Sequence, residues 1–317
     1  MPRLSIILLV LIALVSFSCA RGGVRFNGGF GGGSGFRGLF QFGGGCVAPG
    51  AVRGDDEEAL STEPLVGESW VEDVPGTAIS LVMRPVERAD AAPMWVMERE
   101  VTWNLFDIFI FRLDEKKGKS SPESDAVTRP TKPYIAVDRG FGHENYPALS
   151  MSCKGAVQFA QWLSAKTGRT YRVPTVAEWE LLCSQAKIPQ DDCTAYAWCA
   201  ENSDETTHPV GTKEADALGL HDLYGNVGEW CIVGGTVEEP VGTLKGGSFE
   251  TPLKELTCAE SLPYSPMWND SDPQFPKSIW WLADAAFVGL RLICVETTES
   301  ADQPKESKET TDARQSP

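Results

Sequence analysis

Residues 219–231, GLHDLYGNVGEWC, concentrate the side chains best able to do chemistry. Two carboxylates, Asp222 and Glu229, stand on either side of a turn formed by Gly225 and Asn226, and Trp230 follows directly. A large aromatic ring needs a dry neighbour, whereas carboxylates do not. We therefore expect specific contacts to fix this backbone, which is unlike an ordinary solvated loop.

Three helices are expected to position this segment. Residues 103–113 follow Thr102, an N-cap residue, and their apolar side chains recur at helical spacing. The predicted buried stripe consists of Leu105, Phe106, Phe109, Ile110 and Leu113. The second helix begins near Ser152 and ends before Gly168, a residue type common just past helix C-termini.

The third helix has the strongest local signal. Thr175 with Glu178 three residues later forms the pattern of a capping box after Pro174, and Trp179 and Leu182 fall on its inward face. By itself this pattern indicates a well-capped structural helix. It carries no direct evidence of a binding or catalytic role.

The remaining segments read as strands and loops. Residues 94–98 predict a short strand, residues 116–133 a surface loop and residues 169–174 a turn. Beyond Ala195, Gly and Pro interrupt short apolar stretches such as residues 244–249 and 286–295, which indicates strands and loops. Two adjacent tryptophans within residues 277–287 are expected to fill the core, with an aromatic-lined groove as the alternative.

The two ends differ in composition from the middle. Residues 1–20 have the basic, apolar and small-residue pattern of a signal peptide, with an uncleaved anchor or a lipid anchor on Cys19 as alternatives. Residues 21–59 predict a Gly-rich flexible linker and residues 296–317 a disordered polar tail, which leaves residues 60–295 as the folded domain. We expect no transmembrane span beyond the signal and an exported protein, secreted or in the cell envelope.

Charge limits the classes of partner. The chain has a net charge of −16, although its first 54 residues contain five Arg and no acidic residue. An acidic domain repels phosphate backbones, which argues against nucleic acid as a partner. Good solubility is the simplest reason for such a charge.

Cysteine and histidine supply the remaining reactive groups. Removal of a leader leaves eight cysteines, and an even number in an exported chain suggests disulfides without fixing their pairing: Cys46, Cys153, Cys183, Cys193, Cys199, Cys231, Cys258 and Cys294. Cys193 and Cys199 could close a small loop. The three histidines, His143, His208 and His221, are too scattered to suggest a zinc site.

Five stretches in this order resemble the formylglycine-generating enzyme or sulfatase-modifying factor family. They are REVTWNLFDIF at 99–109, AQWLSAKTGRTYRVPTVAEWE at 160–180, THPVG at 207–211 leading into GLHDLYGNVGEW, LKGGSF at 244–249 and FVGLRL at 287–292. The resemblance implies one domain of a C-type-lectin-like α+β fold with little regular secondary structure. It also implies a family whose active members oxidise a sulfatase cysteine to formylglycine with copper held by two cysteines.

The residues expected to hold copper depart from the family pattern. After the GGS of residues 246–248, Thr251 and Leu256 occupy the positions of the two family cysteines, and soft thiolates are the ligands that copper(I) prefers. The residues nearby that could replace them are Ser248 and Cys258. We therefore expect no copper and no oxidation of sulfatases, and an unrecognised site around Ser248 and Cys258 is the alternative.

Further departures surround this site. A Trp of relatives is replaced by Gly228, another by Cys153, and a common Arg by Glu260. In relatives a structural disulfide joins the third helix to a cysteine just beyond the copper pair, which implies a Cys183–Cys258 disulfide here.

The resemblance also implies calcium in the opening segment. Carried over position by position, the ligands are Asp222, Gly225, Val227 and Glu229, with two carbonyls and two side chains that suit a hard cation. A metal-free turn is the alternative. The sequence thus predicts an exported, non-catalytic, calcium-stabilised binding or accessory module, with sulfatases among its candidate partners. A formylglycine-generating oxidase with a non-standard site and a structural envelope protein are the competing hypotheses.

Overall fold

The computed structural model describes residues 67–89, 92–115, 122–133, 138–189 and 192–296. These residues lie in one compact unit, residues 57–317. The predicted signal peptide, the Gly-rich linker and, beyond residue 296, the polar tail lie outside the described residues.

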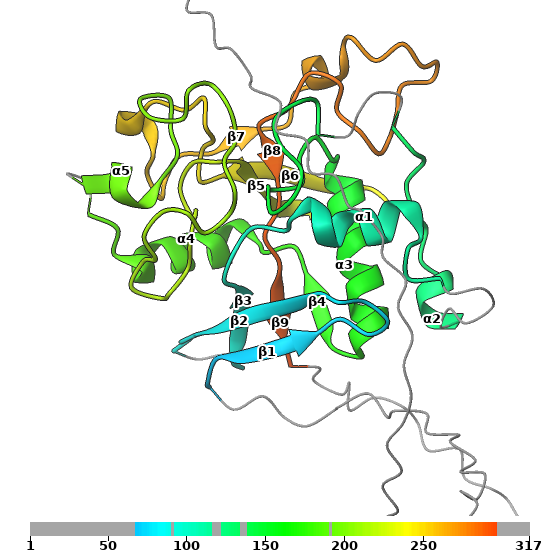
Figure 1. Cartoon of the computed structure of the whole chain (residues 1–317), viewed down its shortest axis with the longest axis horizontal. Helices are drawn as coiled ribbons and strands as arrows, with labels where there is room; N and C mark the ends of the chain where they lie inside the picture. Colours follow the sequence, from blue (N-terminus) through cyan, green and yellow to red (C-terminus); the bar gives the residue numbers. More distant parts are fainter. Residues whose placement is uncertain (1–66, 90–91, 116–121, 134–137, 190–191, 297–317) are drawn as a thin grey trace, which may run out of the picture. The chain divides into compact units, whose positions relative to one another are not determined.

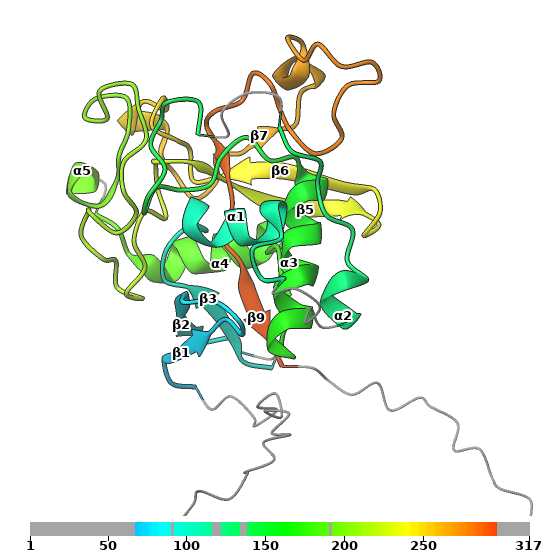
Figure 2. The ribbon, with the colours of Figure 1, turned by 45° about the vertical axis from the view of Figure 1, so that its right-hand side comes forward.

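Two sheets organise the domain. The first is antiparallel in the order β1-β2-β3-β9-β4, formed by Trp70–Asp73, Ser80–Val86, Met94–Met97, Ile293–Val295 and Thr170–Arg172. The second has the order β7-β6-β5-β8, formed by Leu262–Pro263, Pro240–Lys245, Gly228–Gly235 and Val288–Gly289. Figures 1 and 2 show the chain passing from β8 in the second sheet to β9 in the first. Residues 290–292 thus connect the second sheet directly to the first.

Helices make up the rest of the regular secondary structure in the described residues. The helices are α1 (Trp103–Phe111), α2 (Pro122–Asp125), α3 (Cys153–Thr167), α4 (Val176–Ala186) and α5 (Cys193–Tyr196), with 3-10 helices η2 (Leu253–Glu255) and η3 (Pro266–Asn269). None of the helices in the described part of the chain is long and apolar enough to cross a membrane. The mixture of short strands and few helices is the predicted α+β fold in a single domain.

The three predicted helices are confirmed, and so are the caps of α3 and α4, whereas Thr102 precedes α1 without a capping hydrogen bond from its side chain. Ser152 accepts a hydrogen bond from the Gly155 N–H at 3.1 Å, and Gly168 ends α3 with φ of 71°. Thr175 and Glu178 form the predicted capping box of α4. Both signals are local, so the sequence alone identifies them.

Three predictions about elements were wrong. Leu113 lies beyond the end of α1 and is 62% exposed, because the helix ends at Arg112 in a left-handed conformation. The predicted loop at 116–133 contains the short helix α2, and the predicted turn at 169–174 contains β4, which pairs with β9. The partner of β4 lies more than 120 residues later, so no local pattern announces the strand.

Two apolar clusters form the core. The larger packs α1 against α3 through rings such as Phe106 and Phe159, whose centroids are 5.0 Å apart, and it includes Trp280 and Trp281 as predicted. The smaller surrounds Trp179 and Leu182 of α4 and includes Leu223 and Cys231 of the opening segment. Because Val227 and Trp230 belong to the larger cluster, residues 219–231 contribute to both parts of the core.

Candidate functional site

The turn at Gly225 and Asn226 is fixed by backbone hydrogen bonds with two other segments. Gly225 N–H donates to the Gly246 carbonyl at 2.9 Å, and Asn226 N–H donates to the Trp198 carbonyl at 2.8 Å. Gly225 has φ of +77°, and a Cβ there would lie 2.0 Å from the Trp198 oxygen. Only glycine fits this position.

A buried cluster of charges lies beside this turn. Glu100, Asp222, Glu229 and Arg291 are each at most 1% exposed. The Arg291 Nε donates to Glu229 Oε1 at 2.7 Å, and the other Glu229 oxygen accepts from Trp179 Nε1 at 2.7 Å. Both oxygens of Glu229, which the resemblance assigned to calcium, thus accept hydrogen bonds from protein neighbours.

Arg291 uses its remaining N–H groups on backbone carbonyls. One terminal nitrogen donates to Met97 and Glu98, and the other to His221 and Asp222, at distances of 2.7 to 3.1 Å. The guanidinium therefore links β3, the opening segment and the strand residue Glu229. Because its five donors are all used, this arginine has no spare group for an external ligand.

Glu100 also holds the turn in place, through both of its side-chain oxygens. Its two oxygens accept from the Asn226 side-chain amide at 2.7 Å and from the Val227 N–H at 3.1 Å. Burial raises the pKa of Glu100 well above its usual range, and the Asp222 charge raises it further while Arg291 opposes both. Burial also raises the pKa of Asp222 and of Glu229.

The cluster has more carboxyl groups than positive charges. Three carboxyls face one guanidinium, so protons or a cation must offset the rest in a dry interior. Asp222 Oδ2 accepts from Gly211 N–H at 2.6 Å, whereas Asp222 Oδ1 is buried without a hydrogen-bond partner among the described residues. This free oxygen fits a cation ligand.

No group of three or more His, Cys, Asp or Glu side chains in the described residues could hold a metal by itself. A cation at Asp222 would therefore depend on backbone carbonyls and water, as the predicted set with Gly225 and Val227 does. Glu229, the fourth predicted ligand, is held instead by Arg291 and Trp179.

A second candidate site is a cavity of about 120 Å³ beside β6 and β7. Its lining includes Gly228, Ser248, Thr251, Glu260 and Leu262. The Thr251 hydroxyl accepts from the Ser248 N–H at 2.9 Å, and the Ser248 hydroxyl accepts from the Glu250 N–H at 3.2 Å. Both hydroxyls thus stabilise a local turn, and no base contacts either of them in the described structure.

Leu256 does not open into this cavity as a ligand would. It is 1% exposed and packs against Gly247, where a Cβ would lie 2.5 Å from the Leu256 methyl. The two positions that the resemblance assigns to copper ligands therefore hold a hydroxyl engaged in a turn and a buried hydrocarbon.

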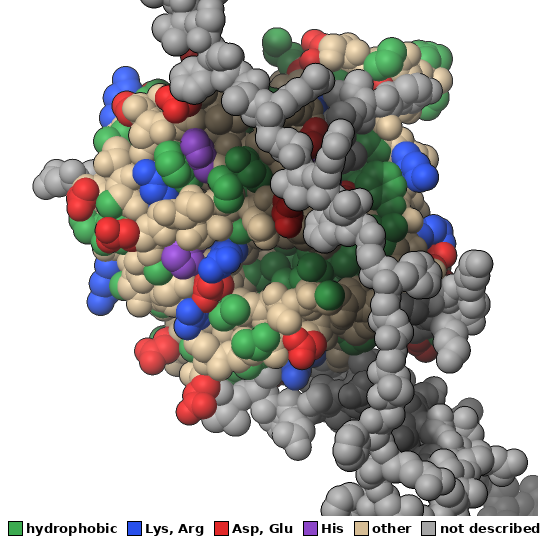
Figure 3. All heavy atoms as spheres, viewed as in Figure 1, with side chains coloured by type: hydrophobic (Ala, Val, Ile, Leu, Met, Phe, Trp, Pro, Cys, Tyr) green, Lys and Arg blue, Asp and Glu red, His purple; other side chains and the backbone are tan. Residues whose placement is uncertain are grey.

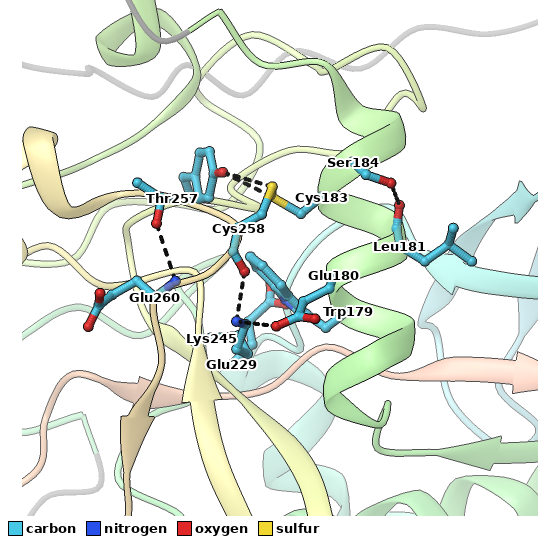
Figure 4. The surroundings of a disulfide bond; sticks show 11 residues. Trp179, Glu180, Leu181, Cys183, Ser184, Glu229, Lys245, Thr257, Cys258 and Glu260 are labelled. Carbon is cyan, nitrogen blue, oxygen red and sulfur yellow. Dashed lines mark hydrogen bonds and ion pairs between the residues drawn. A yellow bond between two sulfur atoms is a disulfide. The ribbon is translucent and has the colours of Figure 1, made fainter.

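Cys258 is joined to Cys183 by a disulfide, which is the pairing that the resemblance implied (Figure 4). The Tyr224 hydroxyl lies 2.9 Å from the Cys183 sulfur, and the buried Lys245 ammonium donates to the Cys258 carbonyl at 2.7 Å. A cysteine in this bond is neither a free copper ligand nor a nucleophile.

The other described cysteines are buried free thiols, so the small loop between Cys193 and Cys199 is not closed by a disulfide. Burial raises the pKa of Cys153 to about 12 and that of Cys193 to about 11. Thiols with such pKa values remain protonated at neutral pH and react slowly. Cys46 lies outside the described residues.

Comparison with known proteins identifies the family. Residues 46–273 match the sulfatase-modifying factor enzyme 1-like domain. The chain belongs to this family. Among solved structures, Treponema denticola variable protein 1 has a TM-score of 0.51 at 18% identity and covers 72% of this chain and 99% of its own. That likeness shows the fold alone.

Curated relatives of this family member match it in part. The chaperone protein LppX of Paenibacillus barcinonensis is 34% identical over 124 residues, which are 32% of this chain and 42% of LppX. The serine/threonine-protein kinase pkn1 of Chlamydia caviae is 32% identical over 139 residues, which are 37% of this chain and 21% of the kinase. The chain thus covers less than half the length of either relative.

Sequence reasoning identified Asp222 and Glu229 but gave no role to Glu100 or Arg291. A signal for both was present, because Arg291 interrupts the apolar residues 286–295 and Glu100 precedes an apolar helix. A charge inside an apolar run must be paired when it is buried. The partner, however, lies in a distant segment.

Proposed function

We propose that this protein is an exported, non-catalytic binding or accessory module of the sulfatase-modifying factor family, stabilised by calcium. The observation that carries the proposal is the chemistry of the cavity beside β6 and β7. Of the two positions that the resemblance assigns to copper ligands, Thr251 lines the cavity and Leu256 is buried outside it, and the nearby Cys258 is joined to Cys183 in a disulfide. The name of the relative LppX, a chaperone protein, also favours an accessory role.

The first test asks whether the protein has oxidase activity. Purified protein with copper and oxygen is expected to leave the cysteine of a sulfatase-derived peptide unchanged, as read by mass spectrometry. An active family member supplies the positive control under the same conditions. Formylglycine formed by this protein would overturn the proposal.

The binding role is tested with the same peptide in its unmodified form. A surface loop that begins at Leu262, on the rim of the cavity, exposes Met267 and Phe275. We expect the peptide to bind the wild type and to bind the double variant Met267→Ser, Phe275→Ser about tenfold more weakly, because exposed apolar anchors dominate such contacts. The matched control removes two exposed apolar side chains elsewhere, Val233→Ser with Val241→Ser, and should bind as the wild type does.

Calcium would be held by the free oxygen of Asp222 with backbone oxygens of the turn. Bound there, the ion would offset the surplus negative charge of the carboxyl cluster. Calcium at about 100 times its dissociation constant stabilises a protein by about 2.7 kcal/mol, which is roughly 5–10 °C for a domain of this size. We expect this rise in melting temperature in the wild type.

The Asp222→Asn variant should show no calcium-dependent rise, and magnesium should not replace calcium. Replacement of an exposed acid, Glu239→Gln, is the matched control and should keep the rise. A wild-type melting temperature that does not respond to millimolar calcium would remove calcium from the proposal and leave the binding role standing.

A further inference from the structure

The largest group of exposed apolar side chains in the described part of the chain lies on residues 261–284, here named the apolar loop. Phe275 is fully exposed and Met267 is 70% exposed. Further side chains that are about half exposed belong to the same loop: Leu262, Tyr264 and Ile279. Figures 1 and 2 show the loop projecting from the second sheet, and in Figure 3 hydrophobic and acidic side chains are interspersed on it at the upper right.

The backbone of the apolar loop is held by its own side chains. The Asn269 side chain donates to the Ser278 carbonyl at 3.1 Å and accepts from the Ala283 N–H at 2.9 Å. The Asp272 carboxylate accepts from the Ser278 N–H at 2.6 Å. Because these bonds order the loop in advance, a partner would lose little entropy by binding to it.

A buried aromatic ring anchors the apolar loop to the core. Trp268 is 8% exposed and packs on Trp230 and Phe287 at centroid distances of 6.0 and 5.4 Å. The Tyr264 ring lies edge-on to Trp268 at 5.6 Å. The exposed apolar side chains are thus displayed on a fixed base, and ordered apolar surfaces of this kind mark interaction sites.

Exposed acids accompany these apolar side chains. Glu255 and Glu260 line one cavity together with Leu262, at the start of the loop. Asp270 lies in the loop itself, and its side chain is 67% exposed. Residues 250–284 contain six acids and two lysines, so the surface has a surplus of negative charge.

The neighbouring cations offset only part of this charge. The ammonium groups of Lys277 and Lys254 lie 3.3 and 3.8 Å from carboxylate oxygens of the same surface. Arg139 donates to two backbone carbonyls at the base of the loop. Glu260 is exposed and forms no ion pair with any residue that the structure describes, so its carboxylate is available to a cation of a partner.

The charge of this surface limits what can cover it. A second copy of the chain would bring the same surplus of negative charge, and the phosphates of nucleic acid or of an anionic lipid surface would be repelled as well. A polypeptide segment that combines apolar side chains with positive charge complements both properties of the surface.

We propose that the apolar loop binds a cationic segment of a partner polypeptide. Apolar side chains of that segment cover Met267 and Phe275. Its basic side chains lie against the exposed acids of the surface: Glu255, Glu260 and Asp270. The proposal rests on the binding role proposed above and names the chemistry of the partner.

A synthetic peptide in which leucine and arginine alternate, spaced by serine, tests the contact with the full-length protein. By fluorescence anisotropy we expect it to bind the wild type, and to bind the double variant Met267→Ser, Phe275→Ser about tenfold more weakly. Peptides with glutamine in place of arginine, or with serine in place of leucine, should each bind the wild type about tenfold more weakly. Equal binding of the arginine and glutamine peptides would overturn the proposal.

The acids of the protein are tested by the double variant Glu255→Gln, Glu260→Gln, which leaves the hydrogen bonds of Asn269 and Asp272 in place. We expect it to bind the arginine peptide about fivefold more weakly, because exposed charge pairs each contribute modestly. Its binding of the glutamine peptide should not change.

The matched control removes two exposed acids from the β5–β6 hairpin, Glu238→Gln with Glu239→Gln, and should bind the arginine peptide as the wild type does. An equal loss in both double variants would assign the binding to the net charge of the chain, which would also overturn the proposal.

Two further measurements address other occupants of the apolar loop. Sedimentation should show a monomeric wild type, and a dimer that dissociates in the variant Met267→Ser, Phe275→Ser would assign the surface to a second copy. Vesicles of phosphatidylglycerol should not bind, and binding that the same variant abolishes would assign the surface to a membrane. Either result would contradict the proposal.

The sulfatase-derived peptide separates this inference from the proposed function. If that peptide binds through Met267 and Phe275 while the arginine and glutamine peptides bind equally well, the binding role stands and the cationic partner does not. If the arginine peptide binds as expected and the sulfatase-derived peptide does not bind, the cationic partner stands and sulfatases are removed from the proposed function.

Discussion

Arg291 is the residue on which the buried charges depend. It donates to Glu229 and to four backbone carbonyls from two segments. Its charge also opposes the rise that burial causes in the pKa of each of the three buried carboxyls, Glu100, Asp222 and Glu229. Arg291 therefore both offsets the negative charge of the carboxyls and holds two backbone segments in place.

We expect Arg291→Met to cost at least about 3–5 kcal/mol of unfolding free energy, because it leaves a buried carboxylate without its partner. Arg291→Lys keeps the charge but cannot supply five donors, so it should be intermediate. The measurement is urea unfolding, with Arg112→Met as the control because Arg112 has a side chain 54% exposed. A shift no larger than that of the control would contradict this role.

Gly225 is required for a steric reason, whereas Arg291 is required mainly for an electrostatic one. Gly225→Ala should destabilise the domain by several kcal/mol, because its Cβ would overlap the Trp198 carbonyl and φ is positive. Gly234→Ala is the control, since nothing lies within 4 Å of its Cβ. The difference between the two melting temperatures measures the effect, and similar values would show that the turn can relax.

At this scale the sequence identified the positions with unusual local context. Asp222, Gly225 and Glu229 stand out because acids, glycine and tryptophan rarely share one short segment. Glu100 and Arg291 could not be placed, because their partners lie across 126 and 62 residues. Pairing over such distances is a property of the fold.

Glu178, in the first turn of helix α4, is expected to make the stability of the domain depend on pH. Burial alone would raise the pKa of Glu178, but hydrogen bonds from Arg172 and from the Thr175 backbone outweigh it and lower the pKa to about 2. Arg172 donates twice, at 2.7 and 2.6 Å. The charged carboxylate is thus the form that holds the start of α4.

Because the folded pKa of Glu178 is lowered, its stabilisation is complete above the ordinary pKa of 4.5 and is lost as pH falls toward 2. We expect Glu178→Gln to cost on the order of 2 kcal/mol at pH 7 and almost nothing at pH 2. Unfolding free energies from pH 7 to pH 2 provide the check, with exposed Glu239→Gln as the control. A cost that does not change with pH would exclude this mechanism.

Elements differ in how far local sequence determines them. α3 and α4 were predictable because caps and apolar faces lie within one stretch of chain. β4 was not, because three residues form a strand only when β9 is beside them. The conformation of residues 261–284 was not predictable either, because it depends on hydrogen bonds of Asn269 and Asp272 that only the structure shows.

For the molecule as a whole, the disulfide joins α4 to the segment after β6 across 75 residues. In the chain-entropy description, closing a loop of this length stabilises the fold by about 4 kcal/mol. We expect the double variant Cys183→Ser, Cys258→Ser to unfold at correspondingly lower urea concentration, with no further effect of reductant. A wild type equally stable with and without reductant, with reduction confirmed by thiol counting, would contradict this.

The order of strands in the first sheet also restricts when the domain can fold. β9, the last strand of the described chain, lies inside the sheet between β3 and β4, and Arg291 precedes it by two residues. A nascent chain emerging from the ribosome would have neither this interior strand nor the cation for its three carboxyls until synthesis of the domain was nearly finished. The first sheet and its buried charge cluster can therefore close only after residues 291–295 have been synthesised.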